Sequence, residues 1–203
     1  MKIKQSYIPI ISILIFLLLI TGCTGDDKYP INKLVSVSYN SVNDTSYVEI
    51  TPSFTGFNNP TAILAGNDQL LYIADQNNNR LVQMNEAGII LETREILNPI
   101  AIAQDLRLDL LVSGEIYYPA SGDTIGALFR IHLFEAAHHL AQAQIETVWI
   151  EPSKPNRRFT GIGVLLENNY FVVRDGPDNS SFVDQDSRVL WFDKNDNKIT
   201  TLI

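Results

Sequence analysis

Cysteine and histidine are scarce in this chain. Among its 203 residues there is one cysteine, Cys23, and there are three histidines. A single cysteine excludes an intramolecular disulfide, and so few Cys and His residues leave no set with the spacing of a zinc site. We therefore expect no metal and no cofactor, and we expect the stability of the fold to come from an apolar core.

Basic residues are also in the minority. The chain has 15 Lys and Arg against 23 Asp and Glu, a formal net charge of −8. An acidic chain without a basic cluster is repelled by nucleic-acid phosphates, so we expect no nucleic-acid partner. The P-loop, G-x-G-x-x-G, G-x-S-x-G and H-E-x-x-H motifs are all missing from the sequence. No catalytic residue is predicted.

The long apolar run at Tyr7–Ile20 follows the charged start with Lys2 and Lys4. Its size is typical of a secretory signal peptide and is short for a membrane span. The run ends in Ile-Thr-Gly-Cys, which resembles the bacterial lipobox, and the resemblance implies a lipid on Cys23. We expect a lipoprotein signal peptide at 1–22 and a lipidated tether at 23–32. The alternative is an uncleaved anchor helix.

We predict that the protein is located in the bacterial cell envelope, where its N-terminal lipid holds it in a membrane. Two acidic residues, Asp26 and Asp27, follow Cys23 closely. They resemble the surface-export signal of some Bacteroidetes lipoproteins. They are equally consistent with solvated charges in a linker. The outer membrane, the periplasmic side and the cell surface all remain open.

The rest of the chain, 33–203, contains a repeat of short apolar runs separated by Gly, Asn and Asp, which is typical of antiparallel strands. Three segments align without a gap, and each is followed by an arginine before the next strand. Their starts are Pro60, Pro99 and Thr160, their ends are Asp75, Gly114 and Asp175, and the arginines are Arg80, Arg130 and Arg188. Repeats of about 40 residues with four strands each predict propeller blades.

The first segment, with its L-Y-I-A-D strand and the turn residues Asp75, Asn78 and Arg80, closely resembles an NHL repeat. The resemblance implies an all-β, NHL-like β-propeller of four-stranded antiparallel blades. It also implies structural roles for the repeat residues: Asp75 and Asn78 hold the turn and Arg80 supports the next strand.

Three units and an N-terminal hairpin at Leu34–Ile50 fall short of a closed propeller, which typically has about four to eight blades. We therefore expect an incomplete propeller, truncated from a longer protein; the alternative is that chains associate to complete it. The second unit carries extra sequence. We expect an inserted loop at Glu115–Leu128 and one short helix at Phe134–Gln144, where Ala, Leu and Gln favour helix.

Three features invite a functional interpretation and have a structural alternative. His138 and His139 are adjacent, and neighbours on a helix point in different directions, which argues against one shared metal. The acidic turn Asp175–Asp186 offers oxygens to Ca²⁺ but lacks the EF-hand register. Tyr117-Tyr118-Pro119 lies in the predicted inserted loop and could line a binding surface.

The sequence thus favours an envelope lipoprotein whose propeller is a non-catalytic binding or scaffold module for an unidentified protein or carbohydrate. The alternative is a propeller enzyme of the amidating-lyase or lactonase type, with a metal in its central channel. That class needs ligands from several blades, whereas all three histidines fall in the second unit.

Overall fold

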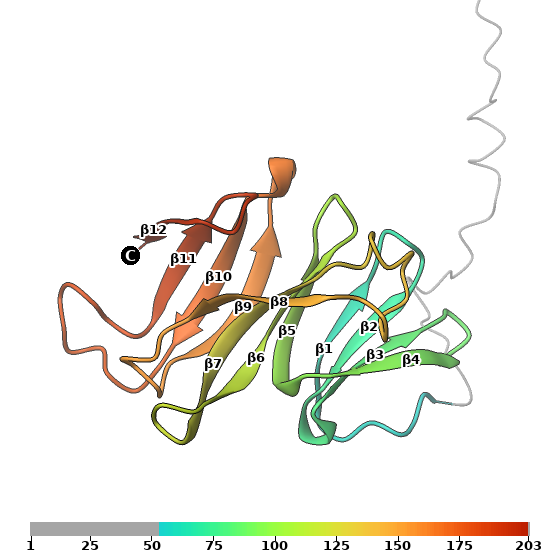
Figure 1. The fold of residues 1–203 in the computed structure, drawn as a ribbon, viewed down its shortest axis with the longest axis horizontal. Helices are drawn as coiled ribbons and strands as arrows, with labels where there is room; N and C mark the ends of the chain where they lie inside the picture. Colours follow the sequence, from blue (N-terminus) through green and yellow to red (C-terminus); the bar gives the residue numbers. More distant parts are fainter. Residues whose placement is uncertain (1–52, 203) are drawn as a thin grey trace, which may run out of the picture. The chain divides into compact units, whose positions relative to one another are not determined.

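The computed structural model describes residues 53–202, and the predicted signal peptide, tether and Leu34–Ile50 hairpin lie outside them. The described part is all-β and folds as three four-stranded antiparallel sheets (Figure 1). Strands β1 to β4 form the first sheet at Pro60–Ala65, Leu71–Asp75, Arg80–Met84 and Ile90–Glu95. The second contains β5 to β8 at Leu97–Gln104, Leu110–Tyr118, Asp123–Ile131 and Ile145–Ile150. The third contains β9 to β12 at Arg158–Val164, Tyr170–Asp175, Arg188–Phe192 and Lys198–Leu202.

Each sheet is a meander in which the strands follow one another in chain order. Short 3₁₀ turns stand at Gln76–Asn78 (η1) and Leu166–Asn168 (η2). Among the first strands of the sheets, β5 lies next to both β1 and β9. Four-stranded units that repeat around their first strands are the plan of a β-propeller. The prediction of an all-β fold with three such units is confirmed.

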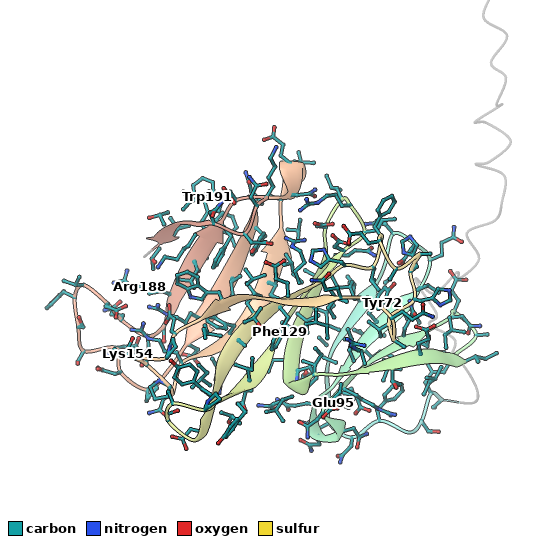
Figure 2. All side chains as sticks on the ribbon, in the orientation of Figure 1. Tyr72, Glu95, Phe129, Lys154, Arg188 and Trp191 are labelled. Atoms are coloured by element: carbon teal, nitrogen blue, oxygen red, sulfur yellow. The ribbon has the colours of Figure 1, made fainter. Side chains whose placement is uncertain are left out.

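Two apolar cores lie between the sheets. Successive side chains of a strand point to opposite faces, and these strands carry apolar side chains on both faces. Tyr72 and Leu81 of the first sheet pack with Leu110 and Phe129 of the second. Figure 2 labels Tyr72 and Phe129. Leu111 and Leu128 of the second sheet pack with a larger group from the third: Phe159, Tyr170, Val172, Leu190 and Phe192. Tyr170 stacks on Phe192, with ring centroids 5.1 Å apart. Sheet-to-sheet packing therefore supplies most of the buried apolar surface.

The predicted loop at Glu115–Leu128 is wrong. These residues extend β6 and β7 into a long hairpin, paired continuously from Leu110 with Ile131 to Tyr118 with Asp123. Gly114 permits the close approach of β5 here, since a Cβ atom on it would lie 2.7 Å from the carbonyl oxygen of Leu97. The extra residues thus pair with each other in the β6–β7 ladder. In a loop, their backbone N–H and C=O groups would have to bond to water instead.

The predicted helix at Phe134–Gln144 is also wrong, since this segment forms a series of turns. Ala137 and His138 have φ of 49° and 65°, in the left-handed region that an α-helix cannot contain. Contacts with the first sheet hold the turns in place. The Ala141 N–H donates to Glu92 at 2.8 Å, and Arg94 donates to the Ala141 carbonyl at 2.6 Å. Tertiary contacts override the helix propensity of the composition.

The third repeat is displaced by one residue from its predicted alignment. The first hairpins close on the pairs Ala65 with Leu71, Gln104 with Leu110, and Val164 with Tyr170. This register makes Arg174, rather than Asp175, the equivalent of Asp75. A slip of one residue reverses the face of every side chain, so the correction changes which residues of the third sheet point toward each neighbouring sheet.

Candidate functional site

A cavity of about 460 Å³ opens at the junction of the second and third sheets. We call it the junction groove. Three connections form it: the β5–β6 turn, the chain from the end of β7 through the following turn, and the β11–β12 turn. Its lining residues are Leu106, Arg107, Leu108, Asp109, Arg130, His132, Phe134, Glu135, Lys194, Asn195 and Asp196.

Arg130 forms the floor of the junction groove and ties the two sheets together. Its Nε and Nη2 atoms donate to the two oxygens of Asp196, both at 2.7 Å, and Nη1 donates to Asp105 at 2.8 Å. Burial alone would lower the pKa of Arg130, but the two carboxylates outweigh it and raise that pKa. The guanidinium is therefore a permanent cation that binds both carboxylates.

Tyr170 completes this network from the third sheet. Its hydroxyl donates to Asp196 Oδ1 at 2.7 Å, and burial, followed by the neighbouring carboxylate, raises the pKa of Tyr170. The phenol thus stays protonated as a hydrogen-bond donor. With Arg130 and Tyr170 both donating to it, the Asp196 carboxylate is held in one orientation.

The two turns beside the network are fixed by their own aspartates. Asp105 Oδ1 accepts from the backbone N–H groups of Arg107 and Asp109, at 2.8 and 3.1 Å. Asp193 Oδ1 accepts from those of Asn195 and Asn197, both at 2.9 Å. Such Asx turns hold a tight loop without help from the strands. The groove therefore has a rigid frame.

The rim of the junction groove is exposed and mixed in character. Phe134 is 67% exposed and Leu106 63% exposed. Arg107 donates to the Lys194 carbonyl at 3.0 Å, which leaves the Lys194 ammonium group outside that bond. His132 lies between Asp109 and Glu146, at 3.7 and 3.3 Å. Apolar, cationic and acidic groups, the last represented by Glu135, thus stand side by side above a rigid floor.

The predicted repeat residues are distributed over all three sheets, and only Arg130 lies at the groove. Asp75 Oδ1 accepts from the Asn58 N–H at 2.7 Å, and Oδ2 accepts from Asn78 and Arg80 at 2.8 and 2.7 Å. Burial opposes ionisation of Asp75, but these hydrogen bonds lower its pKa. The cluster lies at the β2–β3 turn, where it fastens the segment before β1.

The other repeat residues take separate positions. Pro60 begins β1 and Pro99 lies in β5, where its carbonyl accepts from the Thr61 hydroxyl at 3.0 Å. Asp175 accepts from the Ser187 hydroxyl at 2.7 Å. Arg188 donates to the Phe182 carbonyl at 3.4 Å. Arg80 and Arg188 lead their strands, whereas Arg130 lies near the end of β7.

The histidine pair and the acidic turn are bound to other protein groups. His138 lies 3.2 Å from Asp68, and His139 lies 2.7 Å from Glu92. In the acidic turn, Asp186 accepts from Arg157 at 2.7 Å, and Asp184 accepts from Arg174 at 3.3 Å. Within residues 53–202, no group of three or more His, Cys, Asp or Glu is placed to hold a metal ion.

Sequence reasoning missed Asp105, Asp196, Lys194 and Phe134. The sequence does mark the two turns, D-L-R-L-D at 105–109 and D-K-N-D-N at 193–197. Each begins and ends with Asp or Asn, the residues that form Asx turns. No pattern shows that two turns so far apart in the chain meet at one junction. Tyr117, another candidate, is exposed on the β6–β7 hairpin, away from the groove.

Comparisons with known proteins identify no family. No family model matches the chain, and no curated protein matches it. A catalytically inactive virginiamycin B lyase from Staphylococcus aureus, solved with quinupristin, is similar to it in structure, with a TM-score of 0.47 and 13% identity. The match covers 71% of this chain and 41% of the lyase, so the chain spans less than half of that protein. Over the described residues, no helix is long and apolar enough to cross a membrane.

Proposed function

We propose that this protein is a cell-envelope lipoprotein whose propeller-like domain is a non-catalytic binding module, with the junction groove as its contact surface. The supporting observation is that an exposed rim of apolar and charged side chains, with Lys194 and Arg107 among them and Glu135 as the acidic member, stands over a floor fixed by the Arg130 ion pairs. Inter-strand connections at one edge of a rigid β scaffold are common positions for binding residues.

The chemistry of the rim defines the partner. Phe134 and Leu106 offer apolar surface that water solvates poorly, and exposed aromatic residues are typical anchors of protein contacts. Arg107 and Lys194 add cationic groups at the same rim. The matching ligand is a protein segment that presents an apolar side chain next to a carboxylate. A lipid on Cys23 would hold the groove near the membrane, where envelope partners are concentrated.

Site-specific photocrosslinking in cells tests the proposal. A benzophenone amino acid replaces Phe134, and a matched variant carries it at Phe182, which is 95% exposed on the β10–β11 loop. We expect a discrete adduct from position 134 and none of that mass from position 182. Lys194→Glu, added to the position-134 variant, should reduce the adduct. Equal adducts at both positions, or no adduct at position 134, would show that the groove is not a contact surface.

A further inference from the structure

A second cavity, of about 550 Å³, adjoins the junction groove, and we call it the polar compartment. The β5–β6, β9–β10 and β11–β12 turns line it, at one edge of the sheets (Figure 1). Arg107, Lys194 and Asn195 line both cavities. Because Arg107 donates to the Lys194 carbonyl at 3.0 Å, these two residues form a bridge where the cavities meet.

Two consecutive asparagines bring oriented amide groups to the polar compartment. Asn168 Oδ1 accepts from the Leu106 N–H at 2.7 Å, and Asn169 Oδ1 accepts from the Lys194 N–H at 3.1 Å. A backbone N–H can only donate, so each amide must turn its oxygen to that group and its Nδ2 away from it. Neither Nδ2 forms a hydrogen bond with another group of residues 53–202. Two NH₂ donors are thus held in place for a ligand.

The polar compartment carries charges of both signs. Arg107 and Lys194 supply two cations, and Glu167 and Asp193 supply two carboxylates. Asp193 is occupied by its own turn, because it accepts from two backbone N–H groups there, both at 2.9 Å. The Glu167 carboxylate accepts no hydrogen bond from the described residues. A ligand therefore meets donors from the two asparagines and an acceptor from Glu167.

We propose that the polar compartment binds the main chain of the partner segment whose apolar side chain lies in the junction groove, a step that rests on the proposed function. A peptide backbone alternates C=O acceptors with N–H donors, which match the two asparagine amides and the Glu167 carboxylate. Among the described residues, no aromatic ring lines the compartment, so the apolar face of a sugar has no ring to stack on. Main-chain hydrogen bonds here add affinity, while the groove selects the side chains.

Peptide selection on the full chain tests this arrangement, with a phage-displayed library of random heptapeptides as the probe. The chain is immobilised in detergent, and the selected peptides are synthesised so that their Kd can be measured. The double variant Asn168→Asp with Asn169→Asp keeps both oxygen acceptors and removes both NH₂ donors. We expect the selected peptides to bind it about 10- to 100-fold more weakly, as the loss of two hydrogen bonds implies.

The matched control is Asn79→Asp with Asn85→Asp on the first sheet. These asparagines also accept backbone N–H groups through Oδ1, from Asn98 at 2.9 Å and from Ile89 at 3.0 Å. The control adds the same charge away from both cavities and should bind the peptides as the unmodified chain does. The loss in the test variant should persist in 1 M NaCl, where charge effects beyond about 3 Å are screened.

Phe134→Ala separates the two cavities, because Phe134 lines only the junction groove. Peptides that span both cavities should bind this variant weakly as well. Peptides weakened by Phe134→Ala but not by the asparagine variant would use the groove alone, which overturns this inference and leaves the proposed function standing. A loss that disappears in 1 M NaCl would be due to added charge and would also overturn it. Peptides that respond to neither variant, or a library that yields none, would overturn both.

Discussion

Replacing Arg130 by methionine is the sharpest test of how the second and third sheets are held together. Methionine keeps much of the aliphatic volume and removes the charge. Arg130 is 2% exposed and Asp105 is fully buried. The substitution would leave the buried Asp105 carboxylate with only the half-exposed Arg107 guanidinium, 3.4 Å away, and would break three charge-assisted hydrogen bonds. Removing one partner of a buried ion pair costs about 3–5 kcal/mol, and we expect a loss of that size in the free energy of unfolding.

Urea and thermal unfolding, followed by the fluorescence of Trp149 and Trp191, measure this loss. At about 2–4 °C per kcal/mol for a domain of this size, Tm should fall by roughly 6–20 °C. Arg107→Met is the matched control. Its guanidinium also contacts Asp105, at 3.4 Å, but is 50% exposed, so the expected cost is about 0–1 kcal/mol.

A double variant separates lost pairing from lost packing. Asp105→Asn keeps the acceptor that binds the Arg107 and Asp109 N–H groups and removes the charge. Combined with Arg130→Met, it should cost about 0.5–3 kcal/mol less than the sum of the two single changes. A loss below about 1 kcal/mol for Arg130→Met, or strict additivity, would refute an ion-pair network that ties the sheets together.

Three further predictions concern other parts of the chain. Cys23→Ser should move the protein from the membrane to the soluble fraction, because a lipid anchor is what makes such attachment stable; retention in the membrane would contradict lipidation. The folded-state pKa of Asp75 lies below the unfolded value of about 3.9, so the ionised carboxylate stabilises the fold above that value, and this stabilisation is lost as pH falls through the folded pKa. In Asp75→Asn, the free energy of unfolding measured in urea should therefore change less between about pH 5 and 2 than it does in the unmodified protein. Gly88→Ala should destabilise by at least about 1 kcal/mol, because φ is +82° and the new Cβ would meet the Phe54 ring 2.2 Å away; an unchanged urea midpoint would exclude that contact.

Strand positions could be predicted because alternation and turn residues are local properties. The L-Y-I-A-D run of the first repeat, for example, forms β2 at Leu71–Asp75. Register is harder, because an apolar run such as Tyr170–Val173 matches equally well after a slip of one residue. Only the hairpin closure of Val164 on Tyr170 resolves it.

The groove could not be predicted, because it depends on contacts between distant turns. The repeat pattern marks Arg130 as a residue that leads a strand, yet its function in the fold comes from Asp196, 66 positions away. The composition of Phe134–Gln144 is that of a helix, and only the contacts of Ala141 with Glu92 and Arg94 explain its turns. Sequence propensity describes a segment in isolation, whereas these residues are fixed by their neighbours.

The length of one connection explains why a groove opens at the second junction. At both junctions, the polar residue of the third strand reaches the next sheet's connection between its third and fourth strands. At the first junction that connection is the long segment between β7 and β8, which Gln83 meets at the His138 carbonyl. At the second it is the short β11–β12 turn, which supplies the Asp196 carboxylate. The short turn leaves the space that Phe134 and Lys194 border. Lengthening the β11–β12 turn would therefore fill the candidate binding surface while leaving the ladders of both sheets intact.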